Sequence, residues 1–323
     1  MISGNNIKNK LQTILDLPGV YKMLDQYGNI LYIGKSIALK KRIASYLGKE
    51  IKRNKKIKHM LLHLYDVEVY YTDTELDALL LECKWIKRYR PPYNTALMHP
   101  HKYGYLIVEE GPYYALRWSR TKPKKALRIV GPLTHSTLSR KAHEFYKVQY
   151  PFMCCKLEAK ACIKAEFGKC KGYCSEEERI NRLKFFDESL SADSKLDKKV
   201  MAQIETYSLN WDFEKAGDSY EQLKGLHYLR SMDQMIKKLS LQKAIGRIPI
   251  PNTHWYKYYL IHQGTIYKTM RGPLSEEGEI IAHLKELAHK ETVPKEPLLL
   301  KENIDEIKIL YSFFERKMHH IEV

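Results

Sequence analysis

The sequence predicts an α+β fold, and three observations predict it. Short apolar runs joined by a tight turn indicate paired strands near the amino terminus. Segments with apolar residues every three or four positions indicate helices, and a second hairpin pattern appears after residue 255. At 323 residues the chain exceeds one typical domain, so we expect several units, each able to bury a core.

The first hairpin carries two short triplets, Gly19-Val20-Tyr21 and Tyr32-Ile33-Gly34, with ten residues between the two tyrosines. Residues 20–24 and 30–33 have the pattern of strands, and the polar stretch Asp25–Asn29 between them is typical of a turn. Two phenol side chains are therefore expected on neighbouring strands of one hairpin.

Three further elements follow the hairpin in order. Apolar residues at helical spacing between Ile37 and Leu47 predict a helix that places Arg42 beside the hairpin. The run Leu79-Leu80-Leu81-Glu82 sets one carboxylate at the edge of an apolar helix, next to Cys83, which is expected only to pack. The stretch Pro91-Pro92-Tyr93-Asn94 ends the unit.

These five elements, in this order, resemble the GIY-YIG nuclease family, and within it the UvrC and Cho type of bacterial nucleotide excision repair. The resemblance covers residues 17–94 densely. It implies a small antiparallel sheet flanked by helices, in which Glu82 is the only protein ligand of a Mg²⁺ or Mn²⁺ ion. It also implies that Arg42 braces the scissile phosphate through its planar guanidinium group.

The resemblance gives the two hairpin phenols the task of handling the attacking water. Tyr21 and Tyr32 are both candidates for the general base, and the family pattern favours Tyr32. An unperturbed phenol titrates near a pKa of about 10, so a cation must lower it, and Lys35 is the nearest candidate. Asn94 is expected to form hydrogen bonds within the site.

The net charge of +17 is concentrated in the first half of the chain. Residues 1–94 hold 17 Lys and Arg against 9 acidic residues, and residues 95–174 hold 15 against 5. Such a surface fits a polyanion, because basic side chains displace counterions from phosphates, although a merely soluble basic face has the same composition. The candidate DNA contacts are Lys40, Lys41, Lys52, Arg53, Lys55 and Lys56.

The sequence contains no run of eighteen apolar residues and no apolar signal segment at its start. We therefore expect a cytoplasmic protein with no membrane partner, in which structural disulfides are disfavoured.

Five of the six cysteines fall between residues 154 and 174, a density that indicates a soft metal centre. The spacing of Cys162, Cys170 and Cys174 resembles the cysteine pattern of UvrC-like proteins, which implies a 4Fe-4S cluster. The first ligand stays open between Cys154 and Cys155. Zinc is the alternative metal, since four cysteines also hold zinc.

The middle of the chain predicts a small α/β connector and then a helical hairpin. Strands are expected over residues 103–108 and 113–118, and a helix over 139–148. Residues 196–226 read as two amphipathic helices joined near Asn210. They resemble a divergent UVR motif, through which UvrC meets UvrB, and this implies partner contacts by Phe213, Ala216 and Leu223. A plain connecting hairpin is the alternative.

The last part of the chain predicts a further α+β unit. A hairpin is expected around the turn Gln263-Gly264, followed by helices over residues 279–288 and 304–315. The tail His319-His320 is expected to be disordered. No aspartate-rich constellation occurs there, so the RNase H-like second nuclease domain of full-length UvrC is expected to be absent.

The expected organisation is a nuclease domain (1–98), an α/β connector (99–150), a cysteine-rich segment (151–176), a UVR-like helical region (177–232) and a carboxy-terminal α+β unit (233–323). The expected function is one metal-dependent incision, 3′ to a lesion, in DNA marked by UvrA and UvrB. The alternatives are a degenerate DNA-binding module and a GIY-YIG nuclease acting outside excision repair.

Overall fold

The computed structural model describes residues 3–47, 55–110, 116–149, 176–191, 195–241, 243–290 and 300–321. The chain forms two compact units, of which the first combines residues 1–99, 239–298 and 302–323, and the second holds 100–238 and 299–301. None of the described helices is long and apolar enough to cross a lipid bilayer. The predicted cluster ligands Cys154, Cys155, Cys162, Cys170 and Cys174 lie outside the described residues, as do Lys52 and Arg53.

The first unit begins with a three-stranded antiparallel sheet of order β2-β1-β3, built from β1 (Gly19–Leu24), β2 (Ile30–Ser36) and β3 (Asp66–Tyr71). The predicted hairpin is confirmed. Asp25 shapes its turn, because its carboxylate accepts the backbone N–H groups of Tyr27 and Asn29 at 2.9 and 2.8 Å. The helices are α1 (Ser3–Thr13), α2 (Leu39–Leu47), α3 (Lys55–His63) and α4 (Glu75–Tyr89).

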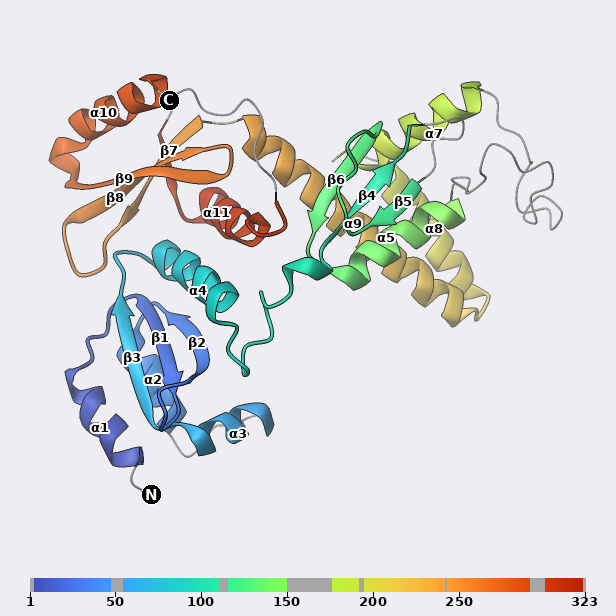
Figure 1. Cartoon of the computed structure of the whole chain (residues 1–323). Helices are drawn as coiled ribbons and strands as arrows, with labels where there is room; N and C mark the ends of the chain where they lie inside the picture. The colour runs from blue at the N-terminus through green and yellow to red at the C-terminus, as the bar shows by residue number, and fades with distance from the viewer. Residues whose placement is uncertain are drawn as a thin grey trace. The chain divides into compact units, whose positions relative to one another are not determined.

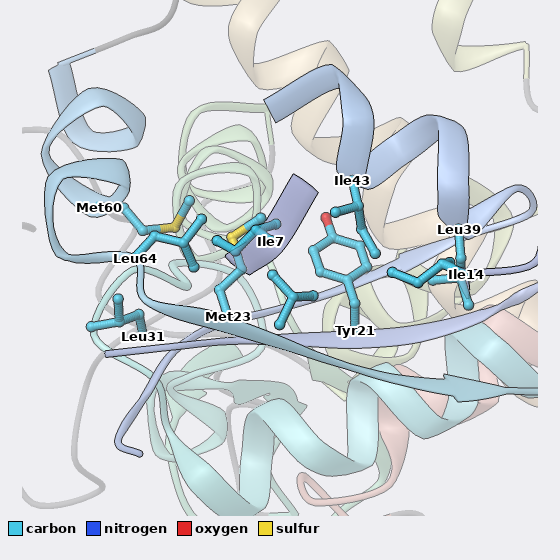
Figure 2. Close-up of a cluster of buried hydrophobic side chains, with 10 residues drawn as sticks. Ile7, Ile14, Tyr21, Met23, Leu31, Leu39, Ile43, Met60 and Leu64 are labelled. Atoms are coloured by element: carbon cyan, nitrogen blue, oxygen red, sulfur yellow. The ribbon is translucent and has the colours of Figure 1, made fainter. Parts of the chain in front are cut away.

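Side chains alternate between the two faces of this sheet, and each face has its own helical layer. Figure 2 shows Tyr21, Met23 and Leu31 packed against residues of α1, α2 and α3, with the Tyr21 ring next to Ile43. On the other face Val20 and Ile33 contact α4. Helix α4 begins with a reciprocal capping box between Thr74 and Asp77, which satisfies backbone donors at its first turn.

The same unit contains a second antiparallel sheet, of order β10-β7-β8-β9. It is flanked by α10 on one side and α11 on the other (Figure 1). Both residues of its predicted turn have positive φ, Gln263 at 49° and Gly264 at 72°, as a type I′ hairpin requires. The elements are β7 (Lys243–Pro249), β8 (Trp255–His262), β9 (Thr265–Pro273), β10 (His319–Ile321), α10 (Glu277–Lys290) and α11 (Ile304–Arg316).

The expectation of a disordered His319-His320 tail is wrong. Both histidines belong to β10, which pairs with β7, and the ring centroids of His320 and Phe314 are 3.9 Å apart. Strand β7 was not predicted from the sequence, and without β7 the tail had no strand with which to pair.

The second sheet packs on helix α4, which also covers one face of the first sheet. Leu76, Leu79 and Leu80 of α4 share one apolar cluster with Tyr259 of β8 and Phe313 of α11. Thr74 adds a buried hydrogen bond of 2.7 Å to the Tyr259 hydroxyl. Residues from the two ends of the chain therefore form one core around the helix that carries Glu82. Cys83, fully buried on that helix, packs as expected.

The second unit has a three-stranded antiparallel sheet of order β5-β4-β6, four described α-helices and a short 3₁₀ helix over Pro100–Lys102. The predicted connector strand over 103–108, the helix and the helical hairpin are present, and β5 covers the described end of the strand predicted over 113–118. The long helix α9 continues past residue 232 to Leu241. The elements are β4 (Gly104–Val108), β5 (Leu116–Ser119), β6 (Arg128–Leu133), α5 (Ser136–Gln149), α7 (Glu176–Ser189), α8 (Leu196–Leu209) and α9 (Phe213–Leu241).

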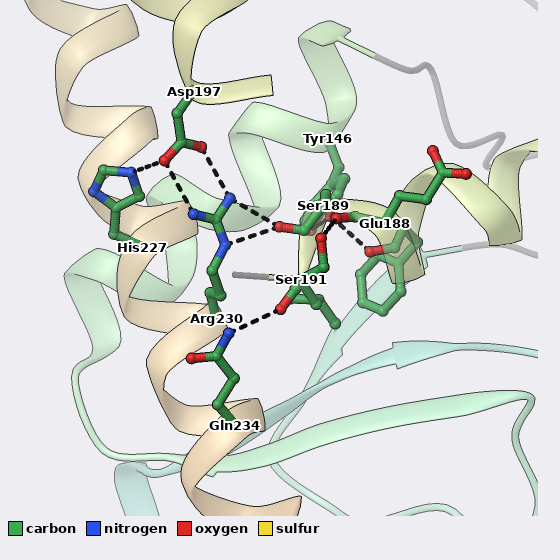
Figure 3. A network of polar contacts seen from close by, with 10 residues as sticks. Tyr146, Glu188, Ser189, Ser191, Asp197, His227, Arg230 and Gln234 are labelled. Carbon is green, nitrogen blue, oxygen red and sulfur yellow. Dashed lines mark hydrogen bonds and ion pairs between the residues drawn. The ribbon is translucent and has the colours of Figure 1, made fainter. Parts of the chain in front are cut away.

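A buried arginine joins three of these helices (Figure 3). The Arg230 guanidinium of α9 donates to the Ser189 carbonyl oxygen at 3.0 Å and to Asp197 of α8 at 2.9 Å. The Ser189 hydroxyl is 2.6 Å from the hydroxyl of Tyr146. A guanidinium group suits this junction because its fixed planar donors serve a carboxylate and a carbonyl together.

Candidate active site

The two triplet tyrosines lie on one face of the hairpin. Tyr21 is paired across the strands with Gly34, and Tyr32 with Met23, so the phenols are diagonal neighbours with ring centroids 6.2 Å apart. A Cβ atom at Gly34 would lie 2.4 Å from the Tyr21 hydroxyl oxygen. Glycine is required here because the Tyr21 hydroxyl occupies the space that any side chain would need.

A third tyrosine, which the sequence analysis missed, joins this pair from α2. The hydroxyls of Tyr46 and Tyr21 are 3.0 Å apart. Arg42 donates from Nε to the Tyr21 hydroxyl at 3.4 Å, and its guanidinium carbon lies 5.1 Å from the Tyr46 ring centroid. Arg42 and Tyr46 are four residues apart on a predicted helix and are therefore surface neighbours, a signal that could have found Tyr46.

Asn94 and Glu82 occupy the outer edge of β2. The Asn94 amide accepts the Ile33 N–H at 3.0 Å and donates to the Ile33 carbonyl at 2.9 Å, as a partner strand would. Two residues further along the strand, the Lys35 backbone N–H donates to Glu82 Oε1 at 2.9 Å. These contacts satisfy outward-facing backbone groups of an edge strand and fix the Glu82 carboxylate next to the tyrosine cluster.

Glu82 fits a hard divalent cation. Burial raises the pKa of its carboxyl, while the Lys35 N–H and the charges of Lys35 and Arg42 act in the opposite direction. Within the described ranges, Oε2 of Glu82 receives no hydrogen bond, and no group of three His, Cys, Asp or Glu side chains is arranged so that it could hold a metal ion. A cation held here would take one protein carboxylate and keep most of its waters, which Mg²⁺ readily does.

Burial also governs the tyrosines. It raises the pKa of Tyr32 to about 12, with further increases from Tyr46 and Glu82, whereas Arg42 lowers it. Burial raises the pKa of Tyr21 as well. The cation that the structure places against the phenols is thus Arg42, and not Lys35 as expected from the sequence.

Lys35 has a different environment because the residue after Gly34 points to the opposite face of the hairpin. Its ammonium group lies 2.6 Å from Glu75 Oε1 at the start of α4. The other Glu75 oxygen lies 2.7 Å from the Lys317 ammonium group. Lys35 therefore contributes its backbone N–H to Glu82 and its side chain to an ion-pair chain that ends near β10.

The predicted DNA contacts that can be placed lie on α2 and α3. Lys40 and Lys55 are exposed, and Lys56 is half-buried. The exposed Lys41 side chain is 3.3 Å from Asp16, so part of its charge is already balanced within the protein.

The predicted partner contacts divide by exposure. Phe213 is 61% exposed, whereas Ala216 and Leu223 are buried within the second unit at 7% and 3%. Of these three residues, only Phe213 is therefore available to a partner. Next to it, at the tip of the helical hairpin, lie the exposed residues Leu209 and Trp211, which the sequence analysis did not single out.

Comparisons with known proteins find one matching domain family and several similar proteins. Residues 17–95 match the UvrC-like GIY-YIG domain family. The UvrABC system protein C of Clostridioides difficile is 28% identical over 97% of this chain and 55% of its own length. The protein of the same name from Haemophilus ducreyi is 30% identical over 70% of this chain and 38% of its own.

The chain spans about half the length of the curated relative that it matches almost from end to end, 55% of the Clostridioides difficile protein. Among solved structures, the magnesium-bound GIY-YIG N-terminal endonuclease domain of UvrC from Thermotoga maritima is 32% identical over 28% of this chain and 97% of that domain. The TM-score of this match is 0.26. The chain thus contains a UvrC-like GIY-YIG domain and is similar to UvrC along most of its length.

Proposed function

We propose that this protein is a metal-dependent endodeoxyribonuclease that makes one incision in damaged DNA, 3′ to the lesion, in nucleotide excision repair. The observation that carries the proposal is the convergence of Tyr21, Tyr32, Arg42 and Glu82 at the edge of β2. Phosphodiester hydrolysis needs a proton acceptor, a cationic group for the phosphate and a site for a metal ion, and this edge offers all three.

Glu82 would hold a Mg²⁺ or Mn²⁺ ion, which supplies positive charge to the scissile phosphate and the leaving oxygen. The exposed guanidinium group of Arg42 binds a non-bridging phosphate oxygen. Tyr32 accepts the proton of the attacking water, and Arg42 favours the phenolate form that does so. Tyr21, hydrogen-bonded to Tyr46, orients Arg42 from the interior.

Mapping the products tests the function. Full-length protein is incubated with UvrA, UvrB and a duplex that carries one lesion and a label at either end of the damaged strand, with Mg²⁺ or Mn²⁺. We expect one cut, on the 3′ side. Binding without any cut would favour the degenerate DNA-binding module, and a second cut on the 5′ side would show another nuclease site.

Tyr32→Phe is expected to lower the rate of nicking by about 100-fold or more, the usual range for losing a general base. The exposed Tyr27, in the turn of the same hairpin, provides the control Tyr27→Phe, which should retain the wild-type rate. Because the Tyr32 pKa lies above neutral pH, its phenolate fraction grows as pH rises, so wild-type nicking should increase between about pH 7 and 9. A Tyr32→Phe variant that keeps this pH dependence would contradict the role of Tyr32.

The helical hairpin would dock on UvrB through its exposed tip. Support comes from Trp211 and Phe213, whose rings are 5.9 Å apart and mostly exposed, since aromatic anchors of this kind dominate protein interfaces. Both rings lie at the end of the hairpin where a partner can reach them, whereas the buried residues of α9 hold the hairpin to its own unit.

The five clustered cysteines would hold a 4Fe-4S cluster, with zinc as the alternative. The proposal rests on their number and spacing in the sequence alone. Iron and acid-labile sulfide in anaerobically purified protein would support the 4Fe-4S cluster. Stoichiometric zinc without sulfide would show instead that the cysteines hold zinc.

A further inference from the structure

An open cavity of about 410 Å³ lies in the second unit, and none of its lining residues belongs to the candidate active site. Three elements form it: the short helix over Pro100–Lys102, strand β5 with the residue that follows it, and the first two turns of α5. Its lining combines cations, hydroxyls and one large aromatic ring, contributed by Lys102, Trp118, Arg120, Ser136, Thr137, Arg140 and His143.

The lining is positively charged, and its charge is poorly balanced. Among the residues that the structure describes, no acidic side chain lines the cavity, and neither Lys102 nor Arg120 forms an ion pair. Arg140 has one weak pair, 3.8 Å from Glu144, and is 68% exposed. Burial and Lys147 lower the pKa of His143, so this ring is neutral at neutral pH. Three like charges around one cavity favour an anionic ligand.

Trp118 gives the cavity a flat apolar wall. Its ring is fixed against the backbone of β4, because a Cβ atom at Gly104 would lie 2.4 Å from Trp118 Cζ2. Trp118 is nevertheless only half-buried, so part of its ring surface is available to a ligand. A held aromatic face beside cations is the combination that single-stranded nucleic acid uses, with the base stacked and the phosphate paired.

We propose that this cavity binds one unpaired nucleotide of a DNA strand, with its base on Trp118 and its phosphate between Arg120 and Arg140. Cavities that enclose small ligands measure about 300 to 1,000 Å³, and the volume here suits a single nucleotide. The inference rests on the proposed function only in taking DNA as the source of the nucleotide. It assigns the second unit a DNA contact that does not depend on cleavage.

Binding of a fluorescently labelled oligothymidylate to the full chain, without divalent cations and in a Glu82→Gln background, tests the cavity independently of nicking. We expect Trp118→Leu, Arg120→Ala and Arg140→Ala each to weaken binding about tenfold, as loss of a stacked base or a phosphate contact does. Each arginine variant should also reduce the slope of log affinity against log salt concentration by about 0.7.

Arg117→Ala is the matched control. Arg117 is exposed on the same strand, points to the opposite face from Trp118 and pairs with Glu109 at 2.7 Å. It carries the same charge but does not line the cavity. Equal losses of affinity for Arg117→Ala and Arg140→Ala would indicate a diffuse basic surface and no defined site. Wild-type binding by all three cavity variants would overturn the proposal.

Competition distinguishes the possible sources of the nucleotide. Unlabelled oligothymidylate should displace the probe at far lower concentration than thymidine monophosphate, since neighbouring phosphates add contacts in a strand. Equal displacement would overturn the assignment to a DNA strand and indicate a site for free nucleotides.

If Trp118→Leu fails to fold, the exposed residues Arg120 and Arg140 still decide the proposal. Because the readout is binding, a protein that binds but never cuts would refute only the proposed function.

Discussion

Glu82→Gln is expected to reduce metal-dependent nicking by about 1,000-fold or more while DNA affinity stays close to wild type. The substitution removes the one carboxylate that would hold the catalytic cation, and each factor of ten in rate corresponds to about 1.4 kcal/mol of lost transition-state stabilisation. The basic residues of α2 and α3 are unchanged, so DNA binding should persist.

The fold should tolerate this change. The glutamine oxygen can still accept the Lys35 N–H, the contact that the carboxylate makes at 2.9 Å. Burial raises the pKa of Glu82, so the ionised carboxylate is disfavoured in the metal-free protein, and a neutral amide removes that penalty. Near neutral pH the metal-free variant should therefore be at least as stable as the wild type.

Two measurements decide this prediction. Nicking is compared with that of Glu279→Gln, which makes the same chemical change at an exposed position on α10 and should be fully active. Thermal unfolding is then followed with and without Mn²⁺, which should stabilise the wild type and Glu279→Gln but not Glu82→Gln. An active Glu82→Gln protein, or one that Mn²⁺ still stabilises equally, would contradict the one-carboxylate site.

The sequence predicts the hairpin of the site well because the signals there are local. Alternating apolar residues and the Asp25–Asn29 turn define both strands, and the structure forms them with the expected pairing. Helical spacing likewise places Arg42 beside Tyr21. The environment of Lys35 could not be read in the same way, since its partner Glu75 is forty residues away and its face depends on strand register.

Tertiary packing decides what the local pattern cannot. The three partner residues proposed on the helical hairpin share one periodic pattern, but Ala216 and Leu223 face the interior of their own unit. His319 and His320 form a strand because they pair with the outer edge of β7. Strand β7 is itself recognisable only in the folded sheet, where it pairs with β8, which in turn pairs with β9.

The packing of the carboxy-terminal elements on α4 leads to the second prediction, that Lys87→Met lowers the free energy of unfolding by about 3 kcal/mol. Lys87 of α4 lies 3.2 Å from Asp305 and 2.7 Å from Glu306 of α11, and the Asp305 side chain is only 6% exposed. Burial opposes the charge of Lys87, but hydrogen bonding to Glu306 and the nearby negative charges raise its pKa overall.

Removing this cation leaves two neighbouring carboxylates at a largely buried contact, and losing one partner of a buried ion pair typically costs about 3 to 5 kcal/mol. Lys84→Met is the matched control, because Lys84 lies on the exposed side of the same helix, and it should change the unfolding free energy by less than about 0.5 kcal/mol. Urea unfolding of both variants gives the comparison. Restoring much of the loss with the double variant Lys87→Met and Asp305→Asn would locate the cost in the Asp305 carboxylate. Equal stability of the two lysine variants would instead show that α11 does not depend on Lys87 to hold the helix that carries Glu82.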